Sequence, residues 1–186
     1  VRLAAALAGS LTLIPLFLLA REWFSPRVAI LSAWLWAITL WPIHLSRIGL
    51  RIILLAPFLA LAAWLATRAF RTPRALLWLL AGVAYGAAFY TYLAVRFTPL
   101  LLAAAIAYLW LMGHGKRLWP GLLWFGLGTT LLLLPLGWLF LRDPALLLGR
   151  TGQVFIFGEA ESLGELWRLV WEQTTAVLGL FFVRGD

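Results

Sequence analysis

The chain has 186 residues, of which 64% are hydrophobic and only 12% are charged, and its mean hydropathy is +0.97. This composition lies outside the range of soluble globular domains and is typical of integral membrane proteins. A net charge of +8 therefore indicates loop topology and contact with anionic lipids rather than nucleic-acid binding. The absence of cysteine excludes disulfides, thiolate metal sites and cysteine nucleophiles.

Long uncharged stretches recur along the first 142 residues of the chain. Each is close to the roughly 17 to 25 residues that cross about 30 Å of hydrocarbon. We therefore expect an all-α, polytopic membrane core at 1–142 with about six transmembrane helices. The predicted spans are 3–20, 28–46, 52–67, 75–95, 97–113 and 118–141.

The basic residues of alternate loops fall into two groups that should lie on opposite sides of the membrane. By the positive-inside rule, the larger group is expected in the cytoplasm. It comprises Arg21, Arg27, Arg68, Arg71, Arg74, Lys116 and Arg117. The smaller group, which is expected outside, comprises Arg2, Arg47, Arg51, Arg96 and Arg142.

The octapeptide HLSRIGLR, from His44 to Arg51, follows the second predicted span. It places Arg47 and Arg51 four residues apart, where the third helix is expected to begin. A helix N-terminus carries partial positive charge, so two guanidinium groups there are unfavourable unless an anion joins them. Arginine forks and free backbone N–H groups would hold a phosphate at such a place.

Other polar side chains are expected on the same outer side. His44 precedes the arginine pair, and Tyr90, Tyr92 and Arg96 lie near the outer end of the fourth predicted span. Guanidinium and phenol donors at headgroup depth suit a lipid-linked phosphate, although Arg96 could also simply cap a helix C-terminus. The predicted lipid-phosphate-binding residues are His44, Arg47, Arg51, Tyr92 and Arg96.

Carboxylates are scarce in the predicted membrane core. Glu22 is the only acidic residue before Asp143, and it belongs to the cytoplasmic group of loops. No general base is therefore expected near the arginine pair within this chain. His44 and His114 should lie on opposite sides, so no histidine metal site is predicted. No cofactor is predicted either, and a role for a divalent metal stays open.

Small residues mark the fourth predicted span. Gly82 and Gly86 form a GxxxG pattern, with alanines around it. Such residues let two helix backbones approach closely. We expect this face to pack within the chain rather than to form a dimer.

The tail at 143–186 differs from the core and holds most of the acidic residues. Its apolar positions, among them Leu163, Trp167 and Trp171, recur at helical spacing. We expect an extracytoplasmic tail with an amphipathic helix lying in the outer leaflet interface. The alternative is a helix packed on a soluble domain that continues beyond the chain.

The first predicted span ends in Ala20-Arg21-Glu22-Trp23-Phe24, and the second runs through Trp41-Pro42 into HLSRIGLR. Further segments are AGVAYGAAFYTYLAVRFTP in the fourth span, the Arg150-Thr-Gly-Gln-Val stretch and the terminal Gly185-Asp186. In this order, these segments resemble the membrane core of bacterial family 39 glycosyltransferases, relatives of the protein O-mannosyltransferases and the lipid A aminoarabinose transferase. The resemblance covers most of the chain.

The resemblance implies an enzyme of the bacterial inner membrane with the GT-C fold. Such enzymes take a sugar from a polyprenyl-phosphate donor, bind the donor phosphate through outward arginines, and draw acidic catalytic residues from the first outer loop. That loop would lie before Val1, so the chain is expected to be a fragment that starts at the second family span and contains no catalytic residue. The acceptor, whether glycan, lipid or protein, is not specified.

Two other functions remain open. A transporter or flippase for an anionic or lipid-linked substrate would also use polytopic helices with outward arginines. A non-catalytic scaffold subunit would tolerate the loss of both Arg47 and Arg51.

Overall fold

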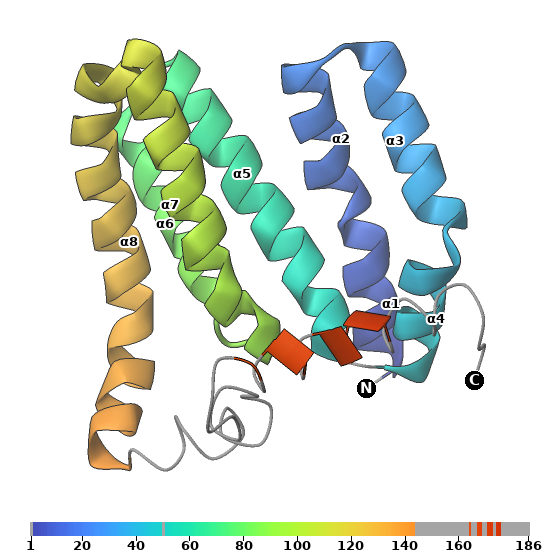
Figure 1. The fold of residues 1–186 in the computed structure, drawn as a ribbon. Coiled ribbons are helices and arrows are strands. Elements are labelled where there is room, and N and C mark those ends of the chain that lie inside the picture. The colour runs from blue at the N-terminus through green and yellow to red at the C-terminus, as the bar shows by residue number, and fades with distance from the viewer. Residues whose placement is uncertain are drawn as a thin grey trace. The chain divides into compact units, whose positions relative to one another are not determined.

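The computed structural model describes residues 2–49, 51–143, 164, 167, 168, 171, 172, 174 and 175. Every regular element in this part of the chain is helical, which confirms the all-α class. The chain divides into two compact units, Val1–Pro135 and Leu136–Asp186. Figure 1 shows the helices of the first unit running alternately up and down.

The chain begins with a helical hairpin. Helices α1 (Arg2–Leu11) and α2 (Leu13–Trp23) follow each other almost without interruption, and α3 (Pro26–Ile38) runs back. The turn between α2 and α3 ends at Ser25, whose Oγ accepts a hydrogen bond from the Val28 N–H at 3.3 Å. A serine N-cap followed by proline at the first helical position is the favoured start of a helix.

The second predicted span is not one helix. Thr39 is extended (φ −68°, ψ 132°), and it separates α3 from α4 (Leu40–Ile48). The break has a covalent cause, because Pro42 has no N–H to give the Ile38 carbonyl and its ring would clash with that carbonyl in a continuous helix. The stretch predicted at 28–46 is therefore corrected to two shorter helices.

The remaining helices complete the first unit. The fourth predicted span ends as a helix at Ala88 rather than at residue 95, and a short 3-10 helix, η2, follows it. Gly113 (φ +83°) lies in the turn before α8, where the chain reverses. The elements are η1 (Arg51–Leu54), α5 (Leu55–Arg71), α6 (Ala75–Ala88), η2 (Leu93–Phe97), α7 (Thr98–Leu109), η3 (Trp110–His114) and α8 (Gly115–Arg142).

Within the described residues, three helical segments are long and apolar enough to cross a membrane: Leu3–Trp23, Ile52–Arg71 and Leu93–Arg142. The last contains the reversal at Gly113, so its two limbs, α7 and α8, run in opposite directions. Helices α3 and α6 are apolar but shorter. A membrane protein is supported, while the count of about six spans stays a prediction.

Helices α5, α6 and α8 share the main core. The core depends on close backbone contact, since a Cβ at Gly82 would collide with the Phe125 carbonyl and one at Gly128 with the Leu79 carbonyl. Thr129 Oγ1 also donates to the Gly82 carbonyl at 3.1 Å. The expected packing of the GxxxG face within the chain is confirmed. The buried core residues are Ala62, Leu65, Ala69, Trp78, Ala81, Ala84, Tyr85, Leu118 and Phe125.

The predicted cytoplasmic loops meet at one end of the first unit. Glu22 after α2 forms an ion pair with Arg71 at the end of α5, at 2.9 Å. Arg117 at the start of α8 donates from Nη2 to the Arg71 carbonyl, also at 2.9 Å. These three segments therefore lie together, as the alternation of loops predicted. We call this the basic end.

The tail is described at only a few positions. Gly164, Trp167, Arg168, Trp171 and Glu172 are helical, and Arg168 Nε lies 3.1 Å from Glu172 Oε1, one turn away. Residues 174 and 175 are helical too, while other parts of the predicted interfacial helix, including Leu163, lie outside the described residues. Its place at the membrane surface stays a prediction.

The glycine contact between α6 and α8 can be tested by adding one methyl group. We expect Gly82→Ala to destabilise the folded protein by about 1 to 3 kcal/mol, because the helices must separate to admit the Cβ. The measurement is the unfolding midpoint of the purified protein in mixed micelles. The matched control is Gly126→Ala, where a Cβ meets nothing within 4 Å. Equal stability of the two variants would contradict the packing argument.

Candidate functional site

Arg47 lies in the last turn of α4, which ends at Gly49 in the left-handed conformation (φ +80°). The Gly49 N–H bonds to the Leu45 carbonyl at 3.1 Å, a usual helix C-terminus. The expectation that Arg47 stands at a helix N-terminus is therefore wrong. At a helix C-terminus the dipole stabilises a positively charged side chain. A glycine two residues after a basic residue is the sequence signal that could have shown this.

Arg51 differs from Arg47 in its setting. Its backbone opens η1, which leads directly into α5. Gly49 interrupts the helix between the two arginines, so they do not share one helical face as predicted. The Arg51 side chain lies outside the described part of the chain.

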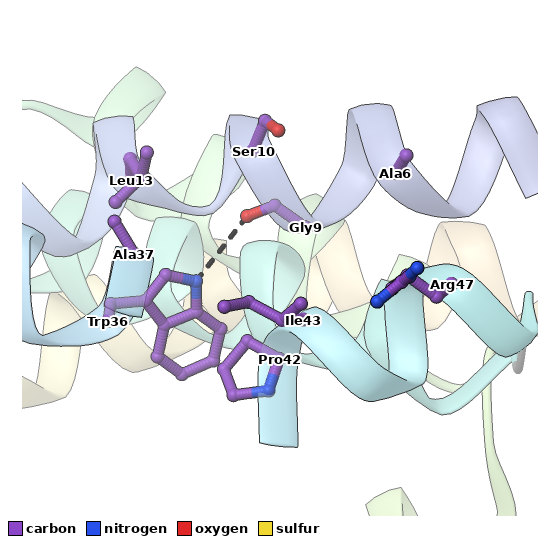
Figure 2. A pocket seen from close by; sticks show the side chains of 9 residues that line it. All are labelled: Ala6, Gly9, Ser10, Leu13, Trp36, Ala37, Pro42, Ile43 and Arg47. Atoms are coloured by element: carbon purple, nitrogen blue, oxygen red, sulfur yellow. Dashed lines mark hydrogen bonds between the residues drawn. The ribbon is translucent and has the colours of Figure 1, made fainter. Parts of the chain in front are cut away.

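Arg47 lines a cavity of about 240 Å³ between α1 and the α3–α4 segment. Figure 2 shows Arg47 at one end of this cavity and Trp36 at the other, with Pro42 and Ile43 between them. The α1 side is formed by small residues, which leave the space open. The lining residues are Ala6, Gly9, Ser10, Leu13, Trp36, Ala37, Pro42, Ile43 and Arg47.

Two contacts hold the walls of the Arg47 cavity in place. Trp36 Nε1 donates to the Gly9 carbonyl at 3.4 Å, which joins α3 to α1. Ile53 of η1 is almost fully buried against Ala5 and Ala8 of α1. The cavity therefore presents one guanidinium group beside an otherwise mostly apolar wall. Such a pairing suits a ligand with an anionic head and an apolar body.

A second cavity adjoins the first. It has a volume of about 450 Å³ and shares Trp36 and Pro42 with the Arg47 cavity. It lies beside the break at Thr39 and is closed by η1 and the start of α5. The sequence pattern did not reveal this cavity, because it depends on how α4 turns away from α3. Its lining is Trp36, Thr39, Pro42, Leu45, Ile52, Ile53, Leu55, Ala56 and Leu59.

The other described residues of the predicted site belong to α4 and η2. His44 is exposed on α4, Tyr92 is exposed at the start of η2, and Arg96 is half-buried in η2. None of the three is among the described side chains that line the Arg47 cavity. The grouping of the predicted set around one phosphate therefore stays a prediction.

The segment that carries Tyr92 and Arg96 is firmly attached to α6. Val95 between them is almost fully buried, and Thr98 Oγ1 lies 2.8 Å from the Tyr85 hydroxyl. The Tyr90 hydroxyl donates to the Leu132 carbonyl of α8, so this phenol is engaged in helix packing.

The described carboxylates and histidines lie apart from one another. Among the described residues, no group of three or more His, Asp or Glu side chains could hold a metal ion. Glu22 lies at the basic end, paired with Arg71. His114 lies there too, 5.6 Å from the Phe70 ring, whereas His44 is on α4 before the other end of α5. The two histidines thus lie at opposite ends of the first unit, while their sides of the membrane stay a prediction.

One known protein family matches most of this chain. The model of the dolichyl-phosphate-mannose-protein mannosyltransferase family matches residues 1–139, most of the chain. No curated protein and no solved structure gives a significant match. Members of this family are membrane glycosyltransferases of the GT-C type, which agrees with the apolar helices of the first unit. The chain therefore belongs to the dolichyl-phosphate-mannose-protein mannosyltransferase family.

Proposed function

We propose that the protein transfers a sugar from a polyprenyl-phosphate donor to an acceptor on the extracytoplasmic side of the membrane. Arg47 and Arg51 bind the donor phosphate in this proposal. The observation that carries it is the Arg47 guanidinium lining a mostly apolar cavity at the end of α4. Family membership supports the reaction class.

The two adjoining cavities suit the two parts of such a donor. A phosphate needs a guanidinium partner, which Arg47 provides. A prenyl chain needs an apolar surface, which the cavity beside Thr39 provides with a wholly apolar exposed lining. Trp36 and Pro42 border both cavities. A donor could therefore lie with its phosphate at Arg47 and its chain past Pro42.

The reaction requires one further group. The acceptor hydroxyl or amine attacks the anomeric carbon, forming the new glycosidic bond while the bond to the phosphate oxygen breaks. The polyprenyl phosphate leaves with its charge stabilised by arginine. In this proposal a carboxylate takes the acceptor proton, and no described carboxylate lines the Arg47 cavity.

His44, Tyr92 and Arg96 remain proposed donor contacts. Helix α6 begins after Arg74 at the basic end and η2 follows its far end, so η2 lies at the same end of the unit as α4. Donors and cations on this side could bind the sugar or a second phosphate oxygen. The proposed location is the bacterial inner membrane, with membrane lipids and an acceptor glycan, lipid or protein as partners and no nucleic acid.

One observation favours transport as the second candidate function. The interruption of α3 and α4 at Thr39 resembles the discontinuous helices that bind substrates in transporters. A transporter or flippase would move the lipid-linked sugar without cleaving it. Release of free polyprenyl phosphate distinguishes the two functions.

Removal of the proposed phosphate contacts should slow transfer. We expect Arg47→Ala and Arg51→Ala, each in the full-length protein, to lower kcat/KM by about 10- to 100-fold, since a hydrogen bond to a charged group contributes roughly 1.5 to 3 kcal/mol. The measurement is transfer of labelled sugar from a polyprenyl-phosphate donor.

The matched control is Arg27→Ala, which removes an exposed arginine at the basic end. This variant should keep the wild-type rate. Arg47→Lys keeps the charge but loses the planar fork, and it should fall between wild type and alanine. Unchanged rates in both alanine variants would refute the site assignment.

The orientation can be tested separately from activity. Because this chain has no cysteine, single substitutions at Lys116 and Ile48 place one thiol at each end of the first unit. In intact cells, a membrane-impermeant maleimide should label Ile48→Cys and spare Lys116→Cys. The opposite pattern would invert the proposed topology.

A further inference from the structure

A third cavity lies at the basic end of the first unit, away from Arg47. Its volume is about 450 Å³, and helices α2, α5, α6, α7 and α8 all contribute to its walls. The small residues Ala63, Ala66 and Ala105 leave the space open, and the buried rings of Trp78 and Phe125 border it. The other lining residues are Trp23, Thr67, Phe70, Leu102, Ile106, Leu109, Leu118 and Leu122.

The lining of this cavity is apolar except at one edge. Thr67 is its one aliphatic hydroxyl, and the Thr67 oxygen already accepts the Trp23 indole N–H at 2.9 Å. A polar molecule would gain no compensation for leaving water in such a space. A hydrocarbon chain would be stabilised in this cavity, because its apolar surface would leave water or a poorly packed environment.

Arg117 and His114 lie near the Phe70 edge of the cavity. The Phe70 ring lines it, and the Arg117 guanidinium carbon lies 4.9 Å from the centre of that ring. The His114 ring lies 5.6 Å from the same ring. An anionic group at this edge would therefore meet Arg117 while an attached chain entered the cavity.

Glu22 does not neutralise this edge. Its carboxylate pairs with Arg71 at 2.9 Å and lies 3.9 Å from Arg68. Arg117 donates one N–H to the Arg71 carbonyl, and a guanidinium group has five donors. The loops gathered here hold seven basic residues against this one carboxylate, so the surface attracts anions.

We propose that this cavity binds an acyl chain of an anionic phospholipid whose phosphate contacts Arg117. A neighbouring cavity of about 470 Å³ shares Ile106, Leu118 and Leu122 with this third cavity, and Lys116 also lines the neighbouring one. A two-chain lipid could place one chain on each side of these shared residues. Charge complementarity and the paired apolar cavities thus point to the same ligand.

This lipid site does not rest on the proposed donor site. Arg47 lies at the other end of α5, whose 17 residues span about 25 Å. Lipid binding can also be measured without any sugar transfer. Failure of one proposal therefore leaves the other standing.

The experiment titrates the full-length protein in detergent with dioleoyl phosphatidylglycerol or dioleoyl phosphatidylcholine and counts bound lipids by native mass spectrometry. We expect the wild type to bind phosphatidylglycerol more tightly. Arg117→Gln should weaken that binding by about fivefold, the worth of one cation at a membrane surface, and should weaken phosphatidylcholine binding less, because the choline offsets the phosphate charge. Ala105→Trp should fill the cavity and weaken both lipids.

Two matched controls accompany these variants. Arg27→Gln removes another exposed arginine of the basic end, and Ala104→Trp adds the same bulk at an exposed α7 position outside the cavity. Both should bind as the wild type does. Equal binding of the two lipids by the wild type, or wild-type binding by Arg117→Gln, would overturn the proposal. Displacement of the lipid by excess inorganic phosphate would overturn it in favour of a soluble-anion site.

Discussion

The first unit depends on the backbone contact between α6 and α8. In a bilayer, apolar side chains gain little by leaving lipid for protein, so helices associate mainly where their surfaces fit closely. Gly82 and Gly128 provide that fit, because each lies against a carbonyl of the other helix, and Thr129 adds a hydrogen bond across it. This contact also positions the segments on either side of α6, namely the basic end before it and η2 after it.

Charged side chains have different surroundings at the two ends of the unit. At the basic end, Glu22, Arg71 and Arg117 form a connected set that ties three helix termini together. Exposed ion pairs contribute little stability. The main effect of these contacts is therefore to fix the positions of the three helix termini relative to one another. At the other end, Arg47 faces an apolar cavity. A charge beside apolar surface at that end is better suited to a ligand than to packing.

Much of the fold could be predicted from the sequence because its determinants are local. Apolar length gave the helices, GxxxG spacing gave the α6 packing face, and alternation of basic loops identified the segments that meet at the basic end. The break at Thr39 was missed because a proline near the middle of an apolar stretch is compatible with either a kink or two helices. A separate error, the unrecognised helix end at Gly49, moved Arg47 from the end of one helix to the start of another. The cavities could not be predicted, since they depend on which residues of distant helices face each other.

The break at Thr39 has a consequence for solvation. Thr39 Oγ1 donates to the Leu35 carbonyl at 2.6 Å, which satisfies one backbone group, but Pro42 can offer the Ile38 carbonyl no N–H partner. Unpaired backbone is tolerated at membrane depth only beside protein or water. The Ile38 carbonyl must therefore take any donor from outside the regular helical ladder, and Thr39 and Pro42, on either side of the break, both line the cavity beside it.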